Sequence, residues 1–327
     1  MIKYTKKNLS ILMFLFIIQG TELVAQTNLQ INSENLQELI EFSKATYTDE
    51  IMLVHGNEVI CNWRNSDCDS IYYNTASMVK SWTGLVIGIL IDKGLIDSED
   101  DLVCSYIPEW KDGCKNQVTI KNLLTMSSGM NRRRGAEGIL AVDSINQYVI
   151  NLELDTLPNI RFGYSNESTQ LLGIIIEKVS GKSANEVFQE VLFEPLGMDS
   201  TRLYRLSSGQ DAVFGGAITT VNDAVNIGLI MLNGGKHNNQ QIVSEGWVDK
   251  SITPSRMASF YGYLWWLDNN SEDKNYAATG DGGKLTIVFP ELNLVFIRRQ
   301  SCNLDISGNM PWMGPDYIKM IADVIKN

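Results

Sequence analysis

The sequence predicts an α+β protein, with an antiparallel sheet flanked by helices and a mainly helical domain inserted into it. Three observations predict this class. Strand-like segments lie towards both ends of the chain, helix signals dominate the residues between them, and no repeat or low-complexity tract interrupts either part. The simplest packing joins the two ends into one sheet, and the junction between sheet and helices is a natural place for a pocket.

The first part of the chain predicts a helix followed by a hairpin. The helix is expected near residues 33–45. Two apolar runs, Ile51 to Val54 and Val59 to Trp63, flank Gly56-Asn57, which is a typical hairpin turn.

The middle of the chain carries helix starts and the last part carries strands. Ser183 and Thr220 each precede an apolar-periodic stretch and have an acidic residue three positions later, a pattern typical of helix N-caps. After them we expect strands at 260–267, 285–289 and 294–298, and a closing amphipathic helix at 315–327.

The first 25 residues indicate an export signal. Lys3, Lys6 and Lys7 precede an apolar run from Ile11 to Ile18, and Leu23-Val24-Ala25 offers a small-residue cleavage site. The apolar run is far shorter than the roughly 20 residues that span a bilayer. We expect residues 1–25 to be a signal peptide, and the mature protein to be periplasmic or secreted without stable membrane insertion.

The mature chain is then divided into two parts. Residues 26–76 and 236–327 form the sheet domain, residues 77–235 form the mainly helical domain, and the active site is expected where they meet.

Composition argues against two functional classes. The chain has 38 acidic and 27 basic side chains and a net charge of −11, whereas a nucleic-acid partner requires a basic surface. It has only 2 histidines and no H-E-x-x-H motif, so a zinc hydrolase is not expected, and neither is any other metal or cofactor.

Export makes disulfides possible for the cysteines. Cys61 and Cys68 lie close in sequence, as do Cys104 and Cys114, and each pair could close a short loop; free thiols are the alternative. Cys302 stands alone. Neither spacing matches a C-x-x-C metal or redox motif.

The strongest chemical signal is a serine followed by a lysine one helical turn later. Two S-x-x-K strings occur, Ser77-Met-Val-Lys80 and Ser271-Glu-Asp-Lys274. The second lies in a polar run between strands, where nothing would desolvate the lysine. Ser77 instead opens a helix that is apolar on every side from Leu85 to Ile91, and such a helix is buried.

This setting suits a nucleophile. A helix N-terminus stabilises negative charge. Lys80 would lie on the same face as Ser77, where partial desolvation favours the neutral amine that can accept a proton. The alternative is that Ser77 is a plain N-cap and Lys80 points to solvent.

A third candidate, Tyr164, lies in a loop that runs into a helix, two residues before Asn166. Ser77-x-x-Lys80 followed by Tyr164-x-Asn166 resembles the serine β-lactamase and penicillin-binding-protein superfamily, in its class C, esterase and nylon-oligomer-hydrolase branch. Other stretches are similar to that branch in the expected order over nearly the whole mature chain: Tyr106 to Trp110, Ile120 to Gly129, Glu194 to Met198, Gly215-Gly216 and Tyr261 to Trp266.

The resemblance implies a β-lactamase-like fold and an acyl-enzyme route. Ser77 would be the nucleophile, Lys80 and Tyr164 its proton-transfer partners, and Asn166 would orient the substrate or Lys80. The implied function is an exported serine hydrolase that cleaves an ester or amide bond in a small-molecule or peptide-like acyl substrate. The sequence leaves the oligomeric state open.

The third motif of that superfamily, K-T-G or H-x-G on a strand beside the site, is less well matched. Its place is taken by Asp281-Gly282-Gly283, followed by Lys284. The two glycines allow a substrate to approach the backbone closely. The resemblance implies that the backbone N–H groups of Ser77 and Lys284 form an oxyanion hole. Asp281 places an anion where the motif carries a cation that holds a substrate carboxylate.

Two alternatives therefore stay open. The protein could be a D-alanyl carboxypeptidase or β-lactamase, which differs in substrate but not in nucleophile. It could also be a non-catalytic ligand-binding member of the same fold.

Overall fold

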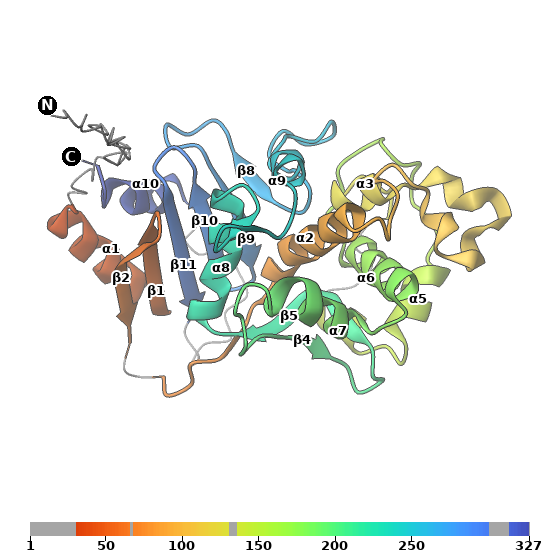
Figure 1. The fold of residues 1–327 in the computed structure, drawn as a ribbon, viewed down its shortest axis with the longest axis horizontal. Helices are drawn as coiled ribbons and strands as arrows, with labels where there is room; N and C mark the ends of the chain where they lie inside the picture. Colours follow the sequence, from red (N-terminus) through yellow and green to blue (C-terminus); the bar gives the residue numbers. More distant parts are fainter. Residues whose placement is uncertain (1–30, 66–67, 131–135, 301–313, 327) are drawn as a thin grey trace, which may run out of the picture.

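The core of the protein is a six-stranded antiparallel sheet built from both ends of the chain (Figure 1). A computed structural model describes residues 31–65, 68–130, 136–300 and 314–326. The strand order is β2-β1-β11-β10-β9-β8. The strands are β1 (Thr48–His55), β2 (Glu58–Arg64), β8 (Trp266–Asp268), β9 (Asn275–Gly280), β10 (Lys284–Phe289) and β11 (Leu294–Gln300).

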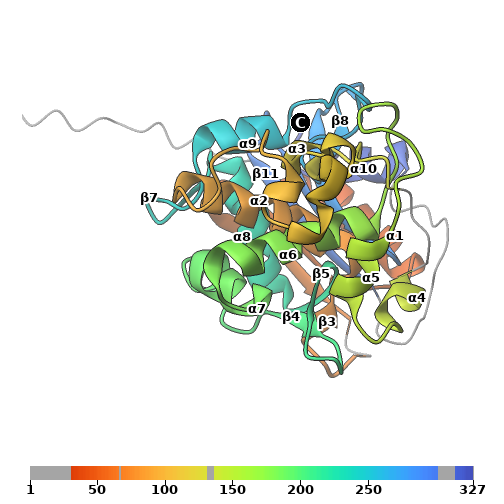
Figure 2. The ribbon, with the colours of Figure 1, turned by 90° about the vertical axis from the view of Figure 1, so that its right-hand side faces the viewer.

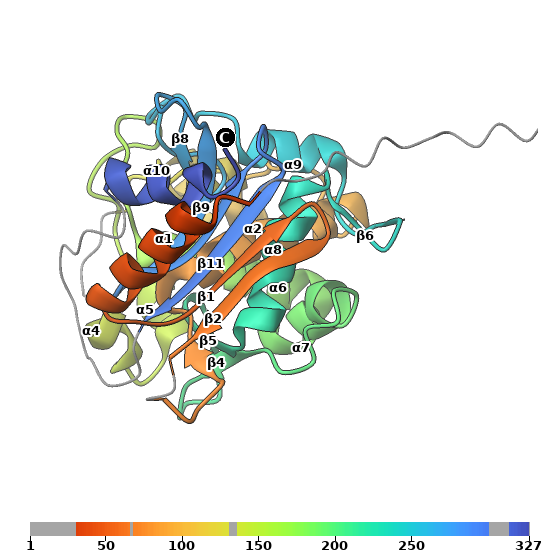
Figure 3. The ribbon, with the colours of Figure 1, turned by 90° about the vertical axis from the view of Figure 1, so that its left-hand side faces the viewer.

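The pairing of β1 with β11 confirms the predicted closure of the two chain ends into one sheet. Alternate residues of β1 enter two different apolar clusters, Ile51 and Leu53 on one face and Met52 and Val54 on the other. Helices α1 (Ser33–Ala45) and α10 (Pro315–Asp323) cover the first face, as Figure 3 shows. Because both faces are covered, β1 is buried along almost its whole length.

The second face of the sheet packs against α2 (Val79–Asp92) and α8 (Val221–Leu232). Helix α2 is buried at nearly every position, as its apolar sequence predicts. Gly88 allows α9 (Glu245–Ser251) to cross it closely, because a Cβ at Gly88 would lie 2.3 Å from Cδ1 of Trp247. The indole Nε1 of Trp247 also donates to the Gly84 carbonyl at 3.0 Å.

The helical part lies on the far side of α2 from the sheet (Figures 1 and 2). Its helices are α3 (Ile120–Leu124), α4 (Ala136–Leu140), α5 (Ile145–Asn151), α6 (Asn166–Ser180) and α7 (Ala184–Phe188). Short helical turns are η1 (Ala76–Met78), η2 (Val103–Ser105), η3 (Pro108–Trp110), η4 (Asp112–Gln117) and η5 (Gln189–Phe193). A three-stranded sheet with the order β3-β5-β4 lies beside them, formed by Tyr73–Asn74, Asp211–Thr219 and Arg202–Arg205; β6 (Lys236–His237) and β7 (Gln240–Gln241) form a separate pair.

Both predicted helix starts are present. Ser183 forms a capping box with Glu186, and the Thr220 hydroxyl accepts a hydrogen bond from the Asp223 amide at 3.1 Å. Helix α8, which follows Thr220, packs on the large sheet so closely that a Cβ at Gly228 would lie 2.5 Å from Val295. Helix α8 therefore packs with the sheet although it precedes residue 235, and the division of the chain into two domains stays a prediction.

Two predicted elements have other bounds in the structure. The expected strand at 260–267 is wrong over most of its length, because only Trp266 and Leu267 belong to β8 and the chain turns at Leu264 with a φ of 63°. Its aromatic residues pack in a cluster beside the sheet, which explains the strand-like composition. Helix α10 ends at Asp323 rather than at the last residue.

Of the two alternatives left open for Cys61, a disulfide with Cys68 or a free thiol, the structure shows the free thiol. Cys61 is a free thiol that packs on the α1 face of the sheet. Cys68 is disulfide-bonded, and its sulfur accepts a hydrogen bond from Arg299, whose guanidinium lies 5.9 Å from the ring of Tyr73 in the cluster of the other face. The two cysteines thus lie towards opposite faces. Cys104 is also disulfide-bonded, and its pairing with Cys114 stays a prediction.

The predicted signal peptide and Cys302 lie outside the described residues. Among the residues that are described, no helix has the length and apolar character needed to cross a bilayer.

The contact between α2 and α9 can be tested with two glycine substitutions. We expect Gly88→Ala to lower the free energy of unfolding by about 1–3 kcal/mol, because the added methyl group overlaps the Trp247 indole. Gly246→Ala in α9 is the matched control, since a Cβ there meets nothing within 4 Å. It should be neutral or stabilising by about 0.5–1 kcal/mol. Urea unfolding measures both, and equal stability of the two variants would contradict the close crossing.

Candidate active site

Ser77 and Lys80 lie together at the start of the central helix. Ser77 sits in η1 and is half-exposed, so its hydroxyl is accessible. The Lys80 Nζ lies 3.0 Å from the Ser77 Oγ, and Lys80 is only 1% exposed. The same amine donates to the carbonyl of Phe214 in β5. The amine is therefore directed at the serine and not at solvent.

Tyr164 completes this group from a third segment. Its ring centroid lies 4.9 Å from the Lys80 Nζ. The loop that carries it is fixed on both sides, because the Gly163 amide donates to the Met126 carbonyl at 2.8 Å and Ser165 caps α6 by accepting from the Ser168 amide. Chain segments almost ninety residues apart thus converge on one buried amine.

Asn166 is the first residue of α6, two positions after Tyr164, and is buried. The other S-x-x-K string does not form such a group. The Ser271 hydroxyl donates to the Asp273 carbonyl at 2.7 Å, while the Lys274 Nζ lies 3.7 Å from a Glu291 carboxylate and is largely exposed.

Tyr164 also packs against other aromatic rings. The Tyr164 ring stacks on Trp266 at 5.7 Å, with an angle of 26° between the planes. Tyr261 meets both rings edge-on. Burial raises the pKa of Tyr261 well above its usual value, and the nearby Tyr164 adds to this effect, so Tyr261 stays a neutral phenol.

The end of β9 touches the nucleophile segment. A Cβ at Gly280 would lie 2.2 Å from the Thr75 carbonyl oxygen and 3.2 Å from the Ala76 Cβ, so only glycine fits. Sequence reasoning missed Gly280. Its signal is the string Ala278-Thr279-Gly280, which reads as a K-T-G motif with alanine in the first position, three residues before the match we predicted.

The predicted motif residues form the turn between β9 and β10. Asp281 is exposed, while Gly282 and Gly283 are buried with φ values of 80° and 77°. Lys284 is the first residue of β10 and pairs with Gly280 of β9 across the hairpin. In the large sheet β10 lies inside β9, further from the edge strand β8. Its Nζ donates to the Asp281 carbonyl at 2.7 Å and to Gln300 Oε1 at 2.8 Å, so its side chain braces the turn.

A buried arginine of β11, Arg298, also holds this turn. Arg298 Nη1 donates to the carbonyls of Gly282 and Gly283, and Nη2 donates to the Thr46 carbonyl at 2.6 Å. Arg298 is fully buried. Sequence reasoning missed this residue too, although an arginine pair following an apolar strand was a visible signal.

Comparison with known proteins identifies the family. The family model described as Beta-lactamase matches residues 51–298. The chain belongs to the Beta-lactamase family. It is 24% identical over 303 residues to the 6-aminohexanoate-dimer hydrolase of Paenarthrobacter ureafaciens, covering 81% of this chain and 76% of that protein. It is 32% identical to penicillin-binding protein 4* of Bacillus subtilis, over 40% of this chain and 30% of that protein.

Solved structures of the Beta-lactamase family show the same fold. A penicillin-binding protein homologue from Pyrococcus abyssi has a TM-score of 0.71 at 21% identity, over 89% of this chain and 75% of that one. A family VIII carboxylesterase has a TM-score of 0.70 at 15% identity, over 89% of this chain and 96% of that one. The predicted superfamily and β-lactamase-like α+β fold are confirmed, and the protein is a serine hydrolase of this fold.

The bracing role of Arg298 leads to a stability prediction. Lysine cannot reproduce the planar fork of donors that serves several carbonyls at once, so Arg298→Lys leaves buried carbonyls without a partner. We expect a loss of about 2–3 kcal/mol in the free energy of unfolding. The control is Arg202→Lys, because Arg202 is exposed and should change stability by less than about 0.5 kcal/mol. Thermal unfolding that is alike in both variants would contradict the role assigned to Arg298.

Proposed function

We propose that the protein hydrolyses an ester or amide bond through an acyl-enzyme on Ser77. The observation that carries this proposal is the buried Lys80 amine, 3.0 Å from the Ser77 hydroxyl and 4.9 Å from the centre of the Tyr164 ring. A neutral amine in this position can accept the serine proton, and a phenol beside it can pass that proton on.

The reaction proceeds in two steps. The Ser77 oxygen attacks the carbonyl carbon of the substrate while its proton passes to the Lys80–Tyr164 pair. The same pair returns the proton to the leaving alkoxide or amine as the bond to the carbonyl carbon breaks. Water then attacks the ester formed on Ser77, giving up its proton to the Lys80–Tyr164 pair. The pair returns that proton to the Ser77 oxygen as the bond from this oxygen to the carbonyl carbon breaks, and the carboxylic acid leaves.

The developing oxyanion requires backbone donors. The Ser77 N–H is one of them. The contact of Gly280 with Thr75 and Ala76 makes the N–H of the next residue, Asp281, a candidate for the second donor, alongside the N–H of Lys284. The Lys284 N–H points away from Arg298, because the preceding Gly283 carbonyl points towards that arginine.

We infer that the substrate lacks a carboxylate at the third motif. Whether this motif is read at Ala278 or at Asp281, it has no cation in its first position. The nearby Lys284 amine is held by a backbone carbonyl and by Gln300. The Paenarthrobacter relative is named as the hydrolase of a 6-aminohexanoate dimer, which supports a substrate other than a penicillin. A D-alanyl carboxypeptidase or β-lactamase activity is the second candidate, supported by the penicillin-binding relative.

We further propose export, on the strength of the signal-like residues 1–25. The periplasm or the extracellular medium would then be the site of action. A non-catalytic binding role is less well supported, since a binder has no need of a buried amine directed at an accessible serine.

Covalent labelling tests the nucleophile. We expect a fluorophosphonate probe to label the wild-type protein and Ser271→Ala equally, because Ser271 belongs to the S-x-x-K string that forms no site. Ser77→Ala should lose all labelling, and Lys80→Met should reduce it by at least about a hundredfold through loss of the base. Intact-protein mass spectrometry locates the adduct.

Other labelling outcomes point to the alternative functions. Strong labelling by a fluorescent penicillin would favour the carboxypeptidase or β-lactamase activity. Labelling by neither probe, in a protein that is folded by circular dichroism, would favour the binding role.

The charge at Asp281 gives a second prediction. Because Asp281 is exposed, Asp281→His should cost little stability. Removing the anion should raise the rate of acylation by carboxylate-bearing esters by roughly threefold to tenfold relative to their neutral analogues, a change of about 0.7–1.4 kcal/mol for one surface charge. Asp249→His is the control, because Asp249 is an exposed acidic residue of α9, outside the turn. No change in the ratio of the two rates would place Asp281 away from the bound substrate.

A further inference from the structure

We propose that the leaving group of the substrate lies against Trp266 and Phe260 and extends into an apolar pocket beside β9. The enzyme would then select substrates whose alcohol or amine portion is an alkyl chain or an aromatic ring. This inference rests on the proposed acyl-enzyme function and adds the class of substrate.

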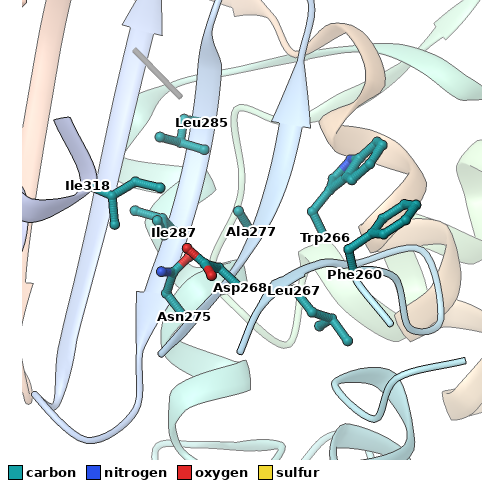
Figure 4. A pocket seen from close by; sticks show the side chains of 9 residues that line it. All are labelled: Phe260, Trp266, Leu267, Asp268, Asn275, Ala277, Leu285, Ile287 and Ile318. Atoms are coloured by element: carbon teal, nitrogen blue, oxygen red, sulfur yellow. The ribbon is translucent and has the colours of Figure 1, made fainter. Parts of the chain in front are cut away.

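The pocket lies at the edge of the sheet, between β8, β9, β10 and α10 (Figure 4). It has a volume of about 190 Å³. Its apolar wall comprises Phe260, Trp266, Ala277, Leu285, Ile287 and Ile318. Since cavities of about 150 Å³ with similar walls hold benzene, this volume suits a six-membered ring or a short alkyl chain.

Two polar residues, Asp268 and Asn275, also line the pocket, and one polar atom of each is hydrogen-bonded within the protein. Asp268 Oδ1 accepts from the backbone amides of Asn270 and Ser271, at 3.3 and 3.1 Å. The Asn275 side chain donates to the Asp273 carbonyl at 2.9 Å. Both side chains hold the turn before β9, which leaves an apolar surface for a ligand.

Trp266 connects this pocket to the reacting groups. Its ring is stacked between Phe260, at 6.2 Å and 12°, and Tyr164, at 5.7 Å and 26°. Figure 4 shows the Trp266 and Phe260 rings side by side at the pocket. Phe260 is 47% exposed, so an apolar face is open there to a ligand. Three roughly parallel rings therefore lead from the Lys80 amine to the pocket.

The role of Tyr164 decides which part of the substrate lies there. A general acid must be within hydrogen-bond reach of the atom that it protonates. In the proposed mechanism Tyr164 protonates the leaving atom, so the leaving group is the part of the substrate beside Tyr164. The Tyr164 ring stacks on Trp266, and Trp266 in turn lines the apolar pocket.

Two matched series of esters test this assignment. In acetate esters of methanol, butanol and hexanol, kcat/KM should rise about twofold to fourfold per methylene group, up to the value for complete burial of a CH₂. In methyl esters of acetic, butanoic and hexanoic acid, it should change much less. The slope of each series is the change in kcat/KM per methylene group. If kcat/KM does not rise with chain length in the alcohol series, or rises only in the acyl series, the assignment is overturned.

A substitution on α10 tests the pocket itself. Ile318→Phe fills the pocket from α10 and should remove the slope of the alcohol series. Met320→Phe is the control, because Met320 is half-buried on the same helix and does not line the pocket. A slope that survives in Ile318→Phe would also overturn the proposal.

Binding to an inactive variant separates this proposal from the proposed function. Ser77→Ala protein should bind hexyl acetate at least about tenfold more tightly than methyl hexanoate, by calorimetry, and Ile318→Phe in that background should abolish the difference. If the wild-type protein forms no acyl-enzyme but this preference holds, the pocket stands and the hydrolase mechanism fails. If acylation occurs without the preference, only the pocket assignment fails.

Discussion

The site depends on one contact, the buried Lys80 amine held between the Ser77 hydroxyl and the Phe214 carbonyl. An amine removed from water is costly unless its hydrogen-bonding capacity is met by the surrounding protein. Here the partners come from two elements, the η1 turn before α2 and the strand β5, and the Tyr164 ring from the loop before α6 lies against the amine. The position of the amine therefore requires the sheet of the helical part, the central helix and the loop before α6 to pack together.

This packing requires neighbouring elements to approach one another closely. Glycine occupies three of the positions where they do so. Gly280 lets the end of β9 touch the segment before Ser77, as Gly88 lets α9 cross α2 and Gly228 lets α8 lie on the sheet. The turn after Gly280 would be free to move if its carbonyls faced solvent. They are instead held by Lys284 and Arg298, so the edge of the site is anchored to the interior of the sheet.

Local patterns in the sequence predicted much of this arrangement. Helix α2 follows from its unbroken apolar run, and the spacing of Ser77 and Lys80 on a helix places them one turn apart. Tyr164 was selected from its place in a loop that runs into a helix, and its role came from the resemblance. Gly280 and Arg298 were missed because their roles arise from segments distant in sequence, the nucleophile loop and the β9–β10 turn. The same limit explains the error at residues 260–267, where aromatic rings gathered around Tyr164 have the composition of a strand.

These contacts also bear on substrate choice. In this chain the positive charges nearest to the third motif have a structural role, since Arg298 is buried beneath the turn and Lys284 braces it. The exposed group at the turn is the carboxylate of Asp281, which disfavours an anionic ligand. On the other side of Tyr164 the surface is aromatic and leads to an apolar pocket. A site that is unfavourable to anions at one edge and open to apolar groups at the other is the physical basis of our proposal that the substrates are neutral acyl compounds rather than penicillins.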